Sequence, residues 1–106
     1  MREVVTDKIN FDEHGLVACI VQNYETGKVL MLGYMNTESL ALTQKSKKVT
    51  FYSRSRRQIW QKGETSGNTL ELIDLSLDCD GDTLLARVNA NGPTCHTGAD
   101  SCFEEV

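Results

Sequence analysis

The chain has 106 residues and a formal net charge of −4, which fits one domain, residues 1–106, built around a single hydrophobic core. The acidic balance argues against nucleic-acid binding, which needs a basic surface, and no apolar run is long enough to span a membrane. The amino terminus lacks the features of a signal peptide, so we expect a cytoplasmic protein whose cysteines stay reduced and free to bind metal.

The first elements along the chain predict a β-hairpin. Residues 1–13 are polar and predict a leader with at most one helical turn, followed by His14, which is interpreted as a surface residue. Residues 16–22 and 29–35 are short apolar runs joined by a glycine-containing turn, a pattern typical of two paired strands. Cys19 lies in the middle of the first run and is interpreted as a small buried hydrophobic residue.

A helix and further strands follow the hairpin. Asn36 or Thr37 is placed to cap a helix that ends near Lys47, with the carboxylate of Glu38 in its favourable first turn. Strand patterns then occur at residues 49–53, 58–61, 69–77 and 82–89. This order predicts an α+β fold with a mainly antiparallel, β-rich sheet and one principal helix.

Seven of the eleven basic residues lie between residues 45 and 62. The lysines before residue 50 are interpreted as a solvated surface. Arg54 and Arg56 would share one face if this segment were a strand, and arginine is suited to bidentate contacts with phosphate. The following loop, residues 63–68, has small residues whose amides could hold an anion. A phosphorylated small substrate and a plain charged turn both remain possible interpretations.

Three cysteines between residues 78 and 102 suggest a zinc site. Cys79, Cys95 and Cys102 supply three ligands, the number that leaves one position open for water. His96 would be the fourth ligand of a closed site, or the general base that assists an open one, or a support for the ligands. No Cys-x-x-Cys pair exists, so the spacing is not that of a zinc finger, and inert thiols remain an alternative.

Asp78, Asp80 and Asp82 are spaced to suggest a second metal. In an extended segment all three carboxylates would point to one side and Cys79 to the other. A hard cation such as Mg²⁺ and a zinc ion would then occupy opposite faces of one strand end. The glycine position and the absence of a closing glutamate exclude an EF-hand, whereas a charged turn between two strands remains the plain alternative.

Five sequence motifs, taken together and in their order along the chain, are highly specific for one protein family. They are Ser53-Arg54-Ser55-Arg56, Trp60-x-Lys62-Gly63-Glu64-Thr65-Ser66-Gly67, Asp78-Cys79-Asp80-Gly81-Asp82, Cys95-His96-Thr97-Gly98 and Ser101-Cys102-Phe103. With them, the chain resembles the phosphoribosyl-AMP cyclohydrolase family of histidine biosynthesis over nearly its whole length.

The resemblance implies an intertwined homodimer with zinc bound by Cys79, Cys95 and Cys102 drawn from both subunits. It matches Asp78, Asp80 and Asp82 to a magnesium site. The implied reaction is hydrolytic opening of the adenine ring of N1-(5-phosphoribosyl)-AMP between N1 and C6 by zinc-activated water, with His96 moving the proton. The substrate-binding candidates within the motifs are Arg54, Arg56, Trp60, Lys62, Glu64 and Ser66; Trp60 either stacks on the base or fills the core.

The chain departs from the family pattern in a few places. Asn68 stands where many relatives have histidine, so no catalytic role is expected for it, and no fused pyrophosphohydrolase domain is expected after Cys102. Two other functions stay open at this point. A non-catalytic zinc module would require four closed ligands and a basic surface, and a nucleobase deaminase normally carries His-x-Glu and Pro-Cys-x-x-Cys motifs, which this chain lacks.

Overall fold

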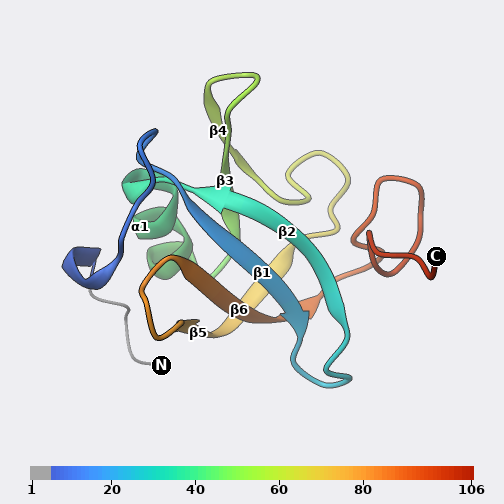
Figure 1. Ribbon diagram of the computed structural model, residues 1–106. Coiled ribbons are helices and arrows are strands. Elements are labelled where there is room, and N and C mark those ends of the chain that lie inside the picture. The colour runs from blue at the N-terminus through green and yellow to red at the C-terminus, as the bar shows by residue number, and fades with distance from the viewer. Residues whose placement is uncertain (1–5) are drawn as a thin grey trace.

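The computed structural model describes residues 6–106 and has an α+β architecture, in which a curved sheet is packed against one helix and a separate β-hairpin (Figure 1). A short 3-10 helix, η1, begins the described part of the chain. The elements, in order, are η1 Thr6–Lys8, β1 Val17–Asn23, β2 Val29–Met35, α1 Thr37–Ser46, β3 Thr50–Ser53, β4 Gln58–Gln61, β5 Leu70–Leu77 and β6 Thr83–Ala90.

The main sheet has the strand order β2-β1-β6-β5. Strands β1 and β2 pair antiparallel, which confirms the predicted hairpin, and β5 and β6 also pair antiparallel. The central pair differs, because β1 and β6 run parallel, with Cys19 opposite Leu84. A parallel pair needs a long crossover, and here the connection contains β2, α1, the β3–β4 hairpin and β5. The sheet is therefore mostly antiparallel, with one parallel seam at its centre.

One face of this sheet forms the core. The alternation of strand side chains sends Cys19 and Val21 of β1 to the same face as Leu84 and Ala86 of β6, and all four are fully buried. The burial predicted for Cys19 is confirmed. In β5, a bulge between Leu72 and Asp74 shifts the register, so the buried positions change phase and continue at Leu75.

Helix α1 is fixed at both ends and packs against β2 and β3. Asn36 is the N-cap: its side chain accepts a hydrogen bond from the backbone of Ser39, whose hydroxyl accepts one from the Asn36 backbone. Lys47 ends the helix in the left-handed conformation at φ 62°. The buried Thr43 hydroxyl accepts a hydrogen bond from the backbone of Thr50 at 2.9 Å, which joins α1 to the start of β3.

The β3–β4 hairpin stands beside the main sheet (Figure 1). Phe51 of β3 is buried, and its ring centroid lies 5.3 Å from that of Trp60 in β4. A Cβ placed on Gly33 of β2 would lie 2.6 Å from the Phe51 ring, so this glycine allows β2 to approach the hairpin closely. Within residues 6–106, no helix is long and apolar enough to cross a membrane.

Candidate active site

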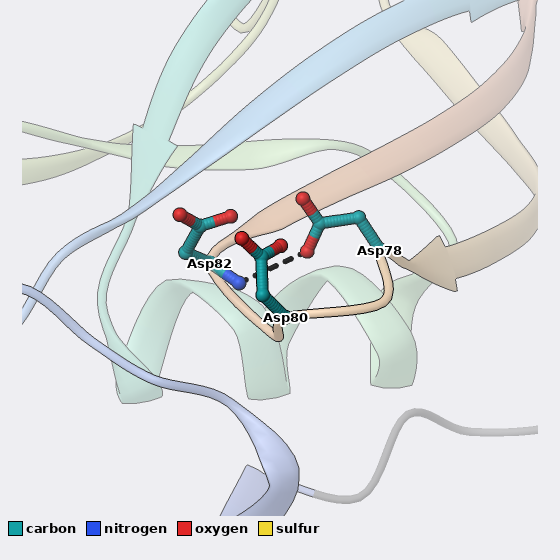
Figure 2. A group of neighbouring side chains, drawn as sticks. All are labelled: Asp78, Asp80 and Asp82. Atoms are coloured by element: carbon teal, nitrogen blue, oxygen red, sulfur yellow. Dashed lines mark hydrogen bonds between the residues drawn. The ribbon is translucent and has the colours of Figure 1, made fainter.

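Three carboxylates converge in the loop between β5 and β6. Asp78, Asp80 and Asp82 are exposed, and one oxygen of each lies within 4.8 Å of the others (Figure 2). The loop is a tight turn: the Asp78 carboxylate accepts backbone hydrogen bonds from Asp82 at 3.0 Å and from Thr83 at 3.1 Å. Gly81 has φ 78°, a conformation that favours glycine.

This geometry corrects the extended arrangement that the aspartate spacing suggested. Strand β5 ends at Leu77, and a turn rather than strand alternation brings the three carboxylates together. The convergence of the carboxylates was foreseen, but its cause was wrong. Because residues 78–82 are not part of a strand, the prediction of two metals on opposite faces of one strand end is wrong.

The three carboxylates share an excess of negative charge. Desolvation raises the pKa of Asp78, but hydrogen bonds from the Asp82 side chain and from the Thr83 and Asp82 backbones outweigh it, so this pKa lies below its usual value. The pKa of Asp82 is raised, chiefly by its hydrogen bond to Asp78 and then by repulsion from Asp78 and Asp80. Such a cluster favours a divalent cation, and oxygen ligands of this type suit Mg²⁺.

The thiols of Cys95 and Cys102 meet at the ends of the loop after β6. The Thr97 hydroxyl donates to the Cys95 sulfur at 3.1 Å, and this contact lowers the pKa of Cys95. Burial raises the pKa of Cys102, as does the hydrogen bond from its thiol to Cys95. Cys95 is therefore the more readily ionised thiol, and Cys102 keeps its proton and donates a hydrogen bond to it, a pairing that fits adjacent metal ligands.

The position of Cys102 depends on strand β2. The Cys102 backbone donates to the Leu30 carbonyl at 2.7 Å, and the buried Ser101 hydroxyl donates to the Val29 carbonyl at 2.8 Å. The loop itself is closed by the Cys95 backbone, which donates to Ala99 at 3.0 Å. His96 is exposed next to Cys95, and its imidazole has no partner among the described residues.

Cys79 does not join the other two thiols within one chain. Across residues 6–106, the only group of three or more metal-ligating side chains whose ligand atoms lie within 4.8 Å of one another is the aspartate cluster. Figure 1 shows why: the loop that carries Cys79, between β5 and β6, lies at the opposite end of the molecule from the red loop that follows β6. A single chain therefore supplies Cys79 at one end and the Cys95–Cys102 pair at the other.

Arg54 and Arg56 both lie in a turn. Strand β3 ends at Ser53 and residues 54–57 form the turn, so the strand that would have placed Arg54 and Arg56 on one face is not formed. Arg54 stacks on Tyr34, with 4.9 Å from its guanidinium carbon to the ring centroid. Arg56 lies 5.7 Å from the Trp60 ring instead, on a different aromatic side chain.

Trp60 is half-buried against the core, and Lys62 lies near its ring at 5.7 Å. Of the two roles considered for this side chain, its contact with Phe51 gives direct support to the packing role. Glu64 and Ser66 are exposed in the loop that follows, and Ser66 accepts a hydrogen bond from the Asn68 backbone at 3.2 Å.

The sequence reasoning missed the partners of Arg54. His14, Tyr52 and Arg57 line a cavity together with Arg54. Arg57 belongs to the basic run, and that run is the signal that would have included it. His14 lies 40 positions before Arg54 and carried no local signal at all.

Comparison with known proteins decides the family. Residues 31–104 match the family model described as phosphoribosyl-AMP cyclohydrolase. The chain belongs to this family. It is similar to the phosphoribosyl-AMP cyclohydrolases of Chlorobium phaeovibrioides and Chlorobaculum tepidum, with 53% and 54% identity over 97 residues, covering 92% of this chain and 71% of each relative.

The family also includes longer proteins. The chain is 52% identical over 101 residues to the histidine biosynthesis bifunctional protein HisIE of Vibrio parahaemolyticus, which covers 94% of this chain and 48% of that protein. The chain thus spans about half the length of the bifunctional relatives it matches. Every candidate site residue from Arg54 to Cys102 lies within the range matched by the family model.

Proposed function

We propose that this protein catalyses the phosphoribosyl-AMP cyclohydrolase reaction in the cytoplasm: hydrolytic opening of the adenine ring of N1-(5-phosphoribosyl)-AMP between N1 and C6, a step of histidine biosynthesis. Membership of the family supports the proposal. The observation that carries it is the pairing, in one small domain, of an acidic cluster suited to Mg²⁺ with two thiols in contact, one of which has a lowered pKa.

Two metals are part of the proposal. Asp78, Asp80 and Asp82 would hold Mg²⁺, and their exposure and mutual repulsion both fit a cation site. Zinc would be held by Cys95, Cys102 and Cys79, a donor set of thiolates that zinc prefers. Bound zinc would supply Lewis-acid activation of the attacking water.

We further propose that the zinc ligands come from two copies of the chain. Cys95 and Cys102 lie in contact, whereas Cys79 lies on a loop at the other end of the molecule. A second copy related by twofold symmetry would bring its own Cys79 to the first copy's pair and complete two equivalent sites. This is the main support for a homodimer.

Other side chains of the protein would transfer the proton and bind the substrate. The exposed imidazole of His96, one residue from a thiol ligand and free of partners, would accept and return the proton. Arg54, Arg56 and Lys62 would neutralise substrate phosphates, held in place by stacking on Tyr34 and Trp60. Glu64 and Ser66 would contact the substrate from the adjoining loop.

Ring opening can be followed directly by ultraviolet absorbance. We expect the purified protein, supplied with zinc and magnesium, to turn over phosphoribosyl-AMP without releasing ammonia. Removal of zinc by a chelator should abolish turnover, and readdition should restore it. Absence of turnover with both metals present would refute the proposed reaction, and release of ammonia would indicate a deaminase.

A further inference from the structure

A cavity of about 370 Å³ lies where the start of β1 meets the β3–β4 hairpin. It is lined by His14, Leu16, Tyr52, Arg54 and Arg57. Two guanidinium groups, one imidazole and one phenol thus border a single space, in a protein whose net charge is −4. No function has been assigned above to His14, Tyr52 or Arg57.

The two arginines of this cavity are not neutralised by ion pairs. Among residues 6–106, the only ion pairs within 4.0 Å are His14 with Glu13 and Arg87 with Asp74. Within the described part of the chain, Arg54 and Arg57 therefore have no carboxylate at that distance. The charges of His14 and Arg54 act on Asp12, whose pKa is lowered chiefly by a hydrogen bond from the Leu16 backbone and less strongly by these two charges.

Two of the groups that line the cavity, Arg54 and Tyr52, are positioned by contacts within the protein. The guanidinium of Arg54 rests on the Tyr34 ring at 4.9 Å. Tyr52 is paired with Ile59 in the hairpin. Arg57 lies in the turn in the left-handed conformation, at φ 52°. Such preorganisation lowers the entropy cost of binding.

The cavity is linked to the acidic loop by a short piece of chain. The Asn10 backbone donates to the Gly81 carbonyl at 2.7 Å, and its side chain donates to the Asp80 carbonyl at 2.7 Å. His14 lies four residues further on. Four residues span at most ~14 Å, so the cationic cavity and the candidate magnesium site lie within the reach of one nucleotide-sized molecule.

We propose that this cavity binds a phosphoryl group of the substrate, with Arg54 and Arg57 as its principal contacts and His14 and Tyr52 as additional hydrogen-bond donors. The proposal rests on the proposed function for the identity of the ligand. Guanidinium groups match the geometry of phosphate oxygens, and a doubly charged phosphomonoester gains most from two cations without counter-ions. Arg56 and Lys62, which flank Trp60, form a separate basic cluster.

The test uses ribose 5-phosphate as the probe, titrated calorimetrically into the protein with a metal chelator present, so that bound cations cannot contribute. The decisive variant is Arg57→Asn, because asparagine accepts the left-handed backbone at this position. Lys47→Asn is the matched control: it removes the same charge from an exposed residue with φ 62°. Arg57→Asn should weaken binding about tenfold or more, by loss of a charge-assisted contact, while Lys47→Asn should not.

Ribose without phosphate should not bind measurably, and His14→Asn should cause a smaller loss than Arg57→Asn. Equal affinity of Arg57→Asn and wild-type protein, or no binding of ribose 5-phosphate by wild type, would overturn the phosphate site. Kinetics separate the two proposals. Arg57→Asn should raise KM for phosphoribosyl-AMP with kcat nearly unchanged. If wild type binds ribose 5-phosphate but opens no ring, the proposed reaction fails and the phosphate site stands.

Discussion

At the scale of single residues, chemically similar side chains are set apart by their surroundings. Cys19 is fully buried at the centre of the sheet, and desolvation raises the pKa of its thiol to about 12. Cys95, half-buried beside the Thr97 hydroxyl, has a lowered pKa instead. The same side chain is thus an inert packing element in β1 and a candidate ligand in the loop after β6, and burial decides which.

The buried thiol predicts an alkaline loss of stability. Between the ordinary thiol pKa of 9.0 and about 12, the unfolded chain ionises Cys19 while the folded chain keeps it protonated. Because the folded state then binds more protons, the free energy of unfolding should fall with rising pH by up to ~1.4 kcal/mol per pH unit from this group. Urea denaturation from pH 8 to 10.5 measures the slope. Cys19→Ala should lower stability near pH 8, where the thiol is protonated in both states, and should flatten the slope at higher pH, whereas Cys79→Ala should leave the slope as in wild type.

His96 offers a second prediction at this scale. If its imidazole moves a proton without binding metal, His96→Ala should retain stoichiometric zinc and lose ~10²–10⁴-fold in kcat. Metal content by atomic emission, measured on the same samples as the rates, separates the two roles. A variant without zinc would show that His96 is a ligand, and normal turnover would exclude it from proton transfer.

At the scale of elements, the pattern of apolar residues predicted most of the fold, because strand alternation and helix caps are local signals. The helix begins after Asn36 and its cap is Lys47, as the capping residues indicated. The parallel pairing of β1 with β6 could not be read from the sequence, since no local pattern specifies which distant strands become neighbours. The turn at Asp78–Asp82 was hidden for a related reason: alternating spacing is compatible with a strand and with a tight loop.

In the loop at residues 78–82, removal of the Asp82 carboxylate should have opposite effects on the stability of the metal-free protein and on its stabilisation by magnesium. Asp82 has a raised pKa because of Asp78 and Asp80, so its charge is unfavourable in the metal-free fold at neutral pH. Asp82→Asn should therefore leave the metal-free protein as stable as wild type or slightly more so, while abolishing the rise in melting temperature that magnesium produces. Thermal unfolding with and without Mg²⁺ measures both. Glu25→Gln, on an exposed turn away from the cluster, is the control and should retain the magnesium effect.

At the scale of the whole molecule, the candidate zinc ligands lie too far apart for one chain to assemble them. The sequence motifs identified Cys79, Cys95 and Cys102 as candidate ligands. Only the structure shows that these three cysteines lie at two ends of the molecule. The cavity that includes His14 was hidden in the same way, since its members come from the leader segment and from a distant hairpin.

A shared zinc site predicts complementation between two inactive variants. Cys79→Ser and Cys102→Ser should each be inactive alone. When the two are unfolded together and refolded as a mixture, half of the dimers are mixed, and each mixed dimer has one intact site of two. Activity should therefore return to about a quarter of wild type. Zinc content should recover in parallel, and a mixture that stays inactive although mixed dimers form would place all three ligands in one chain.

Ser101 positions more than a candidate metal ligand. Strand β2 is an edge of the main sheet, and an edge with free carbonyls invites pairing with strands of other molecules. Here the Ser101 hydroxyl occupies the Val29 carbonyl and the Cys102 backbone occupies that of Leu30. The segment that carries the thiol thus also guards this edge against aggregation. Disruption of this segment would displace the candidate ligand Cys102 and expose the β2 edge at the same time, so a chain damaged here should also be prone to aggregate.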